Sequence, residues 1–176
     1  FGFQSMMPRS GAMIYLKDPG FFDQYFAPGP VACAAADWRD LGAVCALMAL
    51  PGGDWLRSRG AGKFGPTCYE SAYLVDVREA QQGKRQVRVA RMATGAAVAY
   101  AVLAPDSTWG GQVWQLDLFA HPAFADCTGD LLAGLQWPAG TVHCYVDAAS
   151  AALEALRGCG LVEAARLPGL LRRDGD

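Results

Sequence analysis

The order of predicted elements over residues 112–168 constrains the fold more than any other feature of the sequence. Residues 112–119, QVWQLDLF, are rich in β-branched and aromatic residues and are long enough to cross a sheet. The pair His121-Pro122 follows, and proline ends the strand because it has no backbone N–H to donate. A helix, a strand, a second helix and a closing strand are predicted after this turn. A strand that leads through a short loop into a helix N-terminus is suited to hold a phosphorylated cofactor.

The spacing of apolar residues defines these later elements. Thr128 or Asp126 can cap the first helix, which is predicted to be short. The strand after it alternates apolar and polar residues, and the second helix ends at glycines. The apolar positions are Leu131, Leu132 and Leu135 in the first helix, Val142, Cys144 and Val146 in the strand, and Ala152, Leu153 and Leu156 in the second helix, before Gly158 and Gly160.

The first half of the chain predicts one helix followed by a series of strands. Residues 31–36 form a strand, and Asp37 caps a helix that runs to about Leu50. The apolar face of that helix carries Trp38, Leu41, Val44, Cys45 and Met48. Further strands are expected at residues 69–79, where Tyr73, Val75 and Val77 alternate, and at 87–92 and 97–103. Regular strand and turn spacing indicates an antiparallel meander, and hence an α+β sheet.

Composition excludes several classes of protein. About half of the 176 residues are apolar and 18% are charged, so a folded domain is expected rather than a disordered chain. The net charge of −2 argues against a nucleic-acid binder. Six scattered cysteines show no zinc-ligand spacing, so no metal site is expected. We expect a cytoplasmic protein without a membrane span, because no apolar run approaches the roughly 20 residues that a span needs.

Three motifs together resemble the GNAT superfamily, the acyl-CoA-dependent N-acyltransferases. They are L-D-L-F-A-H-P-A-F, then L-L-x-x-L, then A-x-x-x-L-x-x-x-G-L-V-E, over residues 116–163. The resemblance covers residues 31–176 in the order of elements. It implies an α+β fold with a mostly antiparallel, mixed central sheet flanked by helices, and acetyl-CoA or another acyl-CoA as co-substrate.

The resemblance also predicts the extent of the domain. A single GNAT-like domain is expected over residues 7–176. Residues 3–6 look like the remainder of an engineered protease site followed by an initiator methionine, and native sequence from an upstream domain at residues 1–3 is the alternative. GNAT domains close with a hairpin, and residues 161–173 supply only its first strand. Residues 12–17 have the pattern of the missing last strand, so we expect them to pair at the open sheet edge, within the molecule or in a homodimer.

Two groups of cofactor-binding residues are implied by the resemblance. The backbone of Leu118, Phe119 and Ala120 is expected to bind the pantetheine arm in the gap between two splayed strands. The pyrophosphate is expected over the following helix N-terminus, at Asp126, Cys127, Thr128, Gly129 and Asp130. Only Gly129 clearly matches the family pattern at this loop, which is about two residues shorter here. Asp126 and Asp130 bring carboxylates to a place where a like charge disfavours a pyrophosphate.

The catalytic candidates are Asp117 and Tyr145. Asp117 lies on the strand where the family often has a carboxylate base, and a solvated strand residue is the simpler alternative interpretation. The position of the usual family tyrosine falls on Leu156, which cannot donate a proton. Tyr145 or Cys144 on the neighbouring strand can take its place, and core packing is the alternative role for both. His121 is expected to bond within the turn, and His143 to be a surface residue.

The sequence therefore predicts an N-acyltransferase acting on an amine of a small molecule or protein, with no nucleic-acid or membrane partner. The alternative is a catalytically inactive GNAT-like domain that binds or regulates a partner. The retained strand motif and the glycine-rich residues 52–66, where acceptor loops lie in the family, favour an enzyme. The altered pyrophosphate loop and Leu156 favour the inactive domain. An aromatic cluster at residues 21–26 suits a third role, small-molecule binding without catalysis.

Overall fold

The computed structural model describes residues 29–48, 65–109, 111–146 and 150–165. The predicted edge strand at 12–17, the aromatic cluster at 21–26 and residues 52–64 of the glycine-rich segment lie outside these residues. The described elements are, in chain order, β1 (Val31–Ala35), η1 (Trp38–Asp40), α2 (Leu41–Met48), α4 (Gly65–Gln81), β2 (Gln86–Met92), β3 (Ala97–Pro105), η2 (Ser107–Trp109), β4 (Val113–Ala120), η3 (Pro122–Phe124), α5 (Cys127–Ala133), β5 (Thr141–Cys144) and α6 (Leu153–Gly158), where η denotes a 3₁₀ turn.

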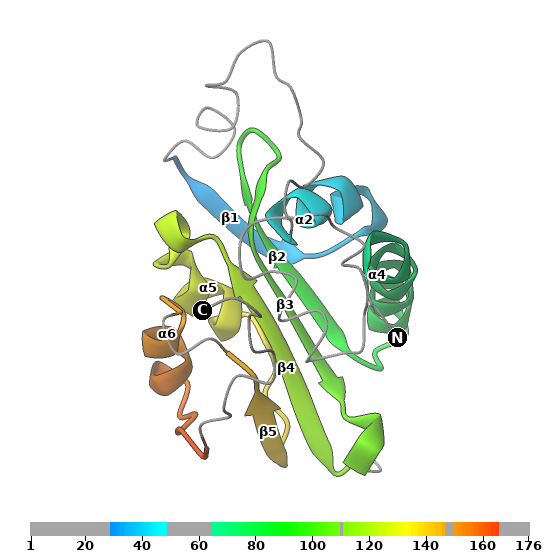
Figure 1. Cartoon of the computed structure of the whole chain (residues 1–176), viewed down its shortest axis with the longest axis vertical. Coiled ribbons are helices and arrows are strands. Elements are labelled where there is room, and N and C mark those ends of the chain that lie inside the picture. Colours follow the sequence, from blue (N-terminus) through cyan, green and yellow to red (C-terminus); the bar gives the residue numbers. More distant parts are fainter. Residues whose placement is uncertain (1–28, 49–64, 110, 147–149, 166–176) are drawn as a thin grey trace, which may run out of the picture.

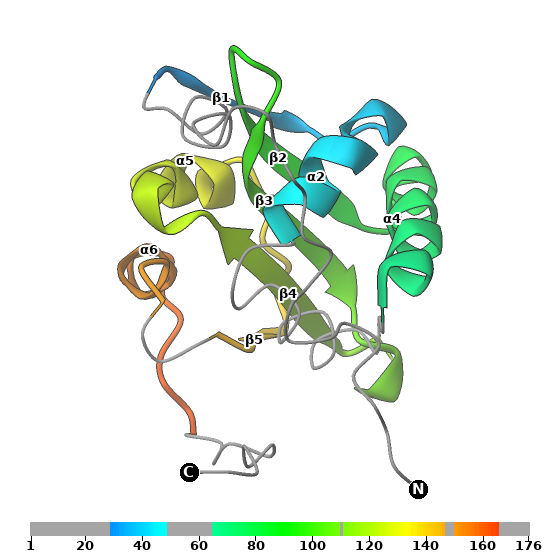
Figure 2. The ribbon, with the colours of Figure 1, turned by 45° about the horizontal axis from the view of Figure 1, so that its top comes forward.

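The five strands of the described residues form one sheet in the order β1-β2-β3-β4-β5. Strands β1 to β4 pair with one another in antiparallel fashion, and β5 pairs with β4 in parallel. Helices α2 and α4 cover one face of the sheet, and α5 and α6 cover the other (Figures 1 and 2). The predicted α+β class and the mixed, mostly antiparallel sheet are confirmed. None of the described helices is long and apolar enough to cross a membrane.

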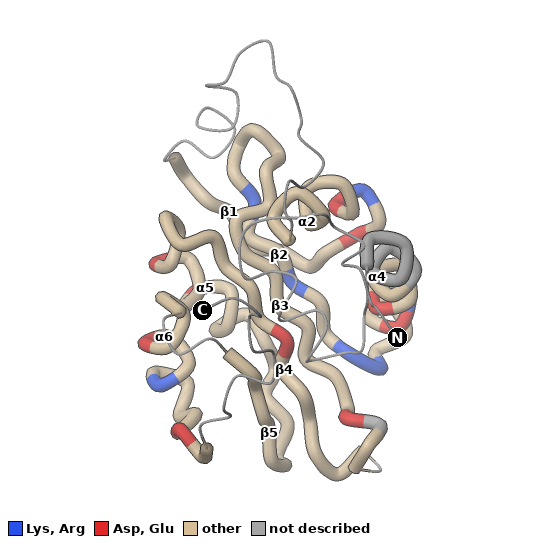
Figure 3. Tube along the Cα trace, in the orientation of Figure 1, with Lys and Arg blue, Asp and Glu red and all other residues tan. Residues whose placement is uncertain are grey.

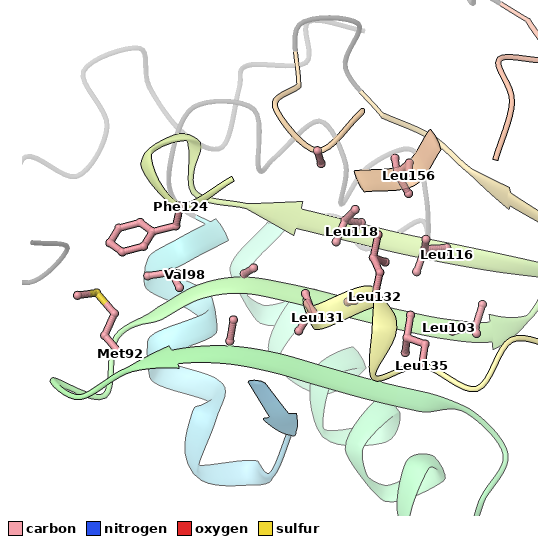
Figure 4. Close-up of a cluster of buried hydrophobic side chains, with 14 of the residues drawn as sticks. Met92, Val98, Leu103, Leu116, Leu118, Phe124, Leu131, Leu132, Leu135 and Leu156 are labelled. Atoms are coloured by element: carbon pink, nitrogen blue, oxygen red, sulfur yellow. The ribbon is translucent and has the colours of Figure 1, made fainter. Parts of the chain in front are cut away.

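Each face of the sheet has its own apolar core, because successive strand residues point to opposite faces. On β4, Leu116 and Leu118 pack against Leu131, Leu132 and other residues of α5 and α6 (Figure 4). Phe119 belongs instead to the core under α2 and α4, which includes Val44 and Tyr73. The side-chain direction along β4 is therefore fixed, with even-numbered residues toward α5 and odd-numbered residues toward α2 and α4.

The strand predicted for residues 69–79 is wrong, because they belong to helix α4. Tyr73, Val75 and Val77 alternate as a strand would, but Tyr73 and Val77 are also four residues apart and share a helix face. In the structure these two are buried, whereas Val75 is exposed. The buried Asp76 forms an ion pair with Arg85, which also pairs with Glu79, and this network fixes the end of α4 beside the start of β2.

The first predicted helix is confirmed and begins as a 3₁₀ turn. The Asp37 carboxylate accepts a hydrogen bond from the Arg39 N–H, and Asp40 reciprocates by accepting from the Asp37 N–H at 2.8 Å, which forms a capping box. Asp40 is also bound by the Arg91 guanidinium from β2. Trp38 is exposed rather than part of the apolar face, because it lies in the turn before α2.

The second half follows the predicted order with two differences. Asp126 occupies the N-cap position of α5 but makes no side-chain capping bond, and Thr128 lies inside the helix, so neither caps it as expected. Residues 161–165 have no strand conformation, although Leu161 packs against the core of α5 and α6. The prediction of a closing strand is therefore wrong for residues 161–165, and residues 166–173 lie outside the described chain.

Candidate active site at the end of the β4–β5 ladder

The parallel ladder between β4 and β5 ends before β4 does. The last registered pair is Leu116 with Cys144, whereas β4 continues to Ala120. On its other side β4 stays paired with β3 as far as Ala99 and Ala120. Within the described part of the chain, no strand pairs with residues 117–120 of β4 on the β5 side. Among the described strands, β4 therefore has partners on both sides as far as Leu116, and from Asp117 to Ala120 it is paired with β3 alone. We call this unpaired edge of β4 the opening.

The direction of the backbone groups at this opening follows from the antiparallel β3–β4 ladder. The His121 N–H donates to the Val98 carbonyl at 2.8 Å, so residues of β4 with odd numbers direct their N–H and C=O groups toward β3. Leu118 and Ala120 consequently direct theirs toward the opening. Of the three backbone positions predicted to bind a pantetheine arm, two face the open side, and Phe119 faces β3 in register with Tyr100.

Both predicted catalytic residues lie at the first step beyond the last ladder pair. Asp117 follows Leu116 on β4, and Tyr145 follows Cys144 on β5. Leu116 and Cys144 face the α5 side of the sheet, so Asp117 projects to the other face. Tyr145 lies on that same face, because its ring contacts the ring of His143, which alternates with Cys144. The fold thus brings the two candidates to one face at the start of the opening.

Asp117 is held by a neighbour on its own strand. The Gln115 side-chain amide donates to Asp117 Oδ1 at 2.7 Å, and the two residues point to the same face because they are two apart. Asp117 is partly buried. Burial raises the pKa of the Cys144 thiol to about 12, and the negative charge of Asp117 adds to this rise. Cys144 therefore stays protonated at neutral pH and packs in the core, as the alternative interpretation of its sequence position expected.

Tyr145 is 38% exposed, and its ring centroid lies 5.4 Å from that of His143. His143 Nε2 in turn lies 3.1 Å from Oδ2 of the buried Asp106. Nε2 is shielded from solvent, and its contact with Asp106 does not have the geometry of a hydrogen bond. Sequence reasoning treated His143 as a surface residue and missed Asp106, because the two lie far apart in the chain and match no known motif.

The predicted pyrophosphate loop is compact. Ala125 and Asp126 have helical dihedral angles, so the chain winds almost continuously from η3 into α5. The Thr128 N–H donates to the Ala125 carbonyl at 3.0 Å, and the Thr128 side chain is fully buried. Gly129 lies within α5, where an added Cβ would meet nothing within 4 Å. Burial raises the pKa of Cys127 to about 11.

Lysine and arginine are absent from a long stretch of the sequence around β4, although Arg88 of β2 lies beside Gly134 at the end of α5. Between Arg91 and Arg157 the sequence has no lysine or arginine, so β3, β4, α5 and β5 carry acidic and uncharged residues alone (Figure 3). Asp126 and Asp130 are both exposed near the start of α5. Leu156, at the position of the usual family tyrosine, is buried in the core beside α5. Among the described residues there is no cluster suited to hold a metal ion.

Comparison with solved structures shows the same architecture in acetyltransferases. The YncA protein of Salmonella typhimurium, a proposed acetyltransferase solved with its cofactor acetyl-CoA, superposes with a TM-score of 0.56 at 15% identity over 84% of this chain and 88% of its own. A proposed acetyltransferase of Acinetobacter baylyi gives 0.54 at 10% identity, covering 84% of this chain and 87% of its own. A proposed phosphinothricin N-acetyltransferase gives 0.50 at 16%, covering 84% and 92%.

The chain has a GNAT-like fold. Its sequence is divergent, because no protein-family model and no curated protein matches it. The GNAT resemblance inferred from the three motifs is thereby confirmed at the level of fold. The comparisons do not test the individual site residues, which stay predictions.

Proposed function

We propose that this chain is an N-acyltransferase that transfers an acetyl or other acyl group from acyl-CoA to an amine of a small molecule or protein. The observation that carries the proposal is the early end of the β4–β5 ladder within a GNAT-like sheet. Leu118 and Ala120 direct backbone groups into this opening, and an extended amide-containing arm can bind to such groups as an added strand does.

The acyl-CoA would supply a thioester carbonyl that an amine can attack. Leu118 and Ala120 would bind the pantetheine arm, with Phe119 between them holding β4 to β3. The first turn of α5, at residues 126–130, would bind the phosphates through backbone N–H groups. This end fits less well than β4, because the Thr128 N–H is already bonded and Asp126 and Asp130 add negative charge.

Two residues of the chain would accept and donate the protons that the reaction transfers. Asp117 would accept the proton that the attacking amine loses, and Gln115 would fix the orientation of its carboxylate. Tyr145 would donate a proton to the leaving sulfur, the role that Leu156 cannot perform. Both lie on one sheet face at the start of the opening, which is the arrangement that a shared reaction centre needs.

Titration with acetyl-CoA tests the proposal. Calorimetry should give one binding site per chain. At a ligand concentration about 100 times Kd, binding should stabilise the fold by about 2.7 kcal/mol and raise Tm by roughly 5–10 °C. Release of free thiol in the presence of small amines and lysine-containing peptides would then identify an acceptor. Absence of binding at millimolar acetyl-CoA would contradict the proposal.

Asp117→Asn tests the assignment of the base. We expect this variant to lose turnover by about 10²-fold or more, with acetyl-CoA affinity unchanged, because the carboxylate acts on the amine and not on the cofactor. Glu154→Gln is the control, since Glu154 is almost fully exposed and lies on α6, which covers the opposite face of the sheet from Asp117. Unchanged turnover in Asp117→Asn would exclude Asp117 as the base.

The second candidate function is a GNAT-like domain that binds a partner without catalysis. The lack of any cation between Arg91 and Arg157 favours it, because CoA phosphates are usually met by positive charge. The same titration separates the two functions. The cytoplasmic location, the single domain over residues 7–176 and a homodimer joined through residues 12–17 stay predictions.

A further inference from the structure

The opening of the sheet is built on two successive layers of polar side chains. Gln115 and His143 are registered partners in the β4–β5 ladder. Asp117 follows Gln115 by two residues on β4, and Tyr145 follows His143 by two residues, just after the end of β5, so each lies next to a ladder residue on the same face. The first layer, Gln115 and His143, lies where β4 and β5 are still paired, and the second layer, Asp117 and Tyr145, lies just beyond the last pair.

Contacts join the two layers on both strands. On β4, the Gln115 amide donates to Asp117 Oδ1 at 2.7 Å. On β5, the rings of His143 and Tyr145 lie 5.4 Å apart, with their planes inclined by 54°. Asp117 keeps its backbone in the β3 ladder, opposite Val102, whereas Tyr145 follows the last residue of β5 and has no registered partner. Tyr145 therefore depends on side-chain contact for its position more than Asp117 does.

His143 is anchored from a third direction by Asp106, in the connection between β3 and β4. The Asp106 N–H donates to the Val113 carbonyl at 2.8 Å, and its Oδ1 accepts from the Thr108 N–H at 2.7 Å. Asp106 is buried, and its second oxygen, Oδ2, lies 3.1 Å from His143 Nε2. A carboxylate fixed by its own turn thus limits rotation of the imidazole ring against which Tyr145 packs.

We propose that His143, anchored by Asp106, is a positioning residue that sets the place of the Tyr145 ring for proton donation to the leaving sulfur. The inference rests on the acyltransferase function proposed above. The competing interpretation is that Asp106 and His143 merely tie β5 to the β3–β4 turn. The two differ in one respect, because a positioning residue acts through Tyr145 and a structural tie does not.

A double-mutant cycle on turnover distinguishes them. His143→Ala should lower kcat by about tenfold, because a misplaced proton donor loses much of its effect, while acetyl-CoA affinity by calorimetry stays unchanged. His143→Phe, which restores a ring beside Tyr145, should recover most of the loss. In a Tyr145→Phe background His143→Ala should have no further effect on kcat, since residues that act through one group are not additive.

The result that would overturn the inference is an equal loss of kcat in both backgrounds. Thr141→Ala is the control, because Thr141 is exposed on the same strand and face. The Tyr145 ring signal, followed by NMR in protein with ¹³C-labelled tyrosine and assigned with Tyr145→Phe, should shift in His143→Ala and in Asp106→Asn but not in the control. An unmoved signal would also overturn the inference. A wild-type protein that binds no acetyl-CoA would instead refute the proposed function itself.

Discussion

Replacing Thr128 with valine should stabilise the protein. The Thr128 side chain is fully buried in α5, and its hydroxyl has no hydrogen-bond partner among the described residues. A buried hydroxyl without a partner costs about 1–3 kcal/mol relative to water, by protein mutational data. Valine keeps the branched shape and has nearly the same helix propensity as threonine, so removal of the hydroxyl is the main change.

From these terms we expect Thr128→Val to raise the free energy of unfolding by about 1–2 kcal/mol, which corresponds to a rise in Tm of roughly 3–6 °C. Urea unfolding and calorimetry of the ligand-free protein measure both quantities. Thr141→Val on the exposed side of β5 is the matched control and should change stability by no more than about 0.5 kcal/mol. Acetyl-CoA affinity should not change, because the hydroxyl faces the core and not the opening.

A less stable Thr128→Val variant would refute this reasoning. It would mean that the hydroxyl is bonded in the folded protein and that α5 is held by a polar contact. Thr128→Ser separates this outcome from simple loss of packing, because serine keeps the hydroxyl and removes only the methyl group. We expect Thr128→Ser to be destabilised by about 1 kcal/mol.

Two further predictions concern titratable groups. Burial raises the pKa of Asp40, but its hydrogen bonds and ion pair with Arg91 outweigh burial and hold the pKa below its usual value. This carboxylate therefore stabilises the fold above its unfolded pKa of about 3.9, and the stabilisation is lost as pH falls through the lower folded value. Asp40→Asn should flatten the decline of unfolding free energy measured in urea below about pH 4, and an unchanged pH dependence would exclude the effect. Burial also raises the pKa of Cys127 to about 11 and of Cys144 to about 12, so iodoacetamide should modify the exposed Cys159 before these two, with mass spectrometry reporting the order. Modification of Cys144 before Cys159 in the folded protein would contradict its burial.

The sequence predicted correctly those elements whose spacing of apolar residues fits only a helix or only a strand. β4 was recognised because its apolar residues alternate and a proline follows, and α5 because Leu131, Leu132 and Leu135 fit a helix and no strand. Helix α4 was missed because Tyr73 and Val77 suit both periods. The choice between helix and strand depends on tertiary packing of this segment over β2 and β3, and the local sequence carries no signal for that packing.

Some parts of the candidate site could be predicted from the sequence and others could not. Asp117 and Tyr145 were chosen from their strands, and parallel register then brought them to one face. The Asp106–His143 contact could not be predicted, because it depends on how the turn after β3 folds back beside β5. The place where β5 leaves β4 was expected from family resemblance alone. No pattern in either strand marks Leu116 and Cys144 as the last pair.

Amide hydrogen exchange along β4, followed by NMR with and without acetyl-CoA, tests the central claim most directly. Leu118 and Ala120 face the opening, whereas Phe119 faces β3 and serves as an internal control. Addition of acetyl-CoA should slow exchange at Leu118 and Ala120 and leave Phe119 unchanged, because new hydrogen bonds protect only amides that bind the arm. Binding of acetyl-CoA with no change at Leu118 and Ala120, or with an equal change at all three amides, would contradict the account.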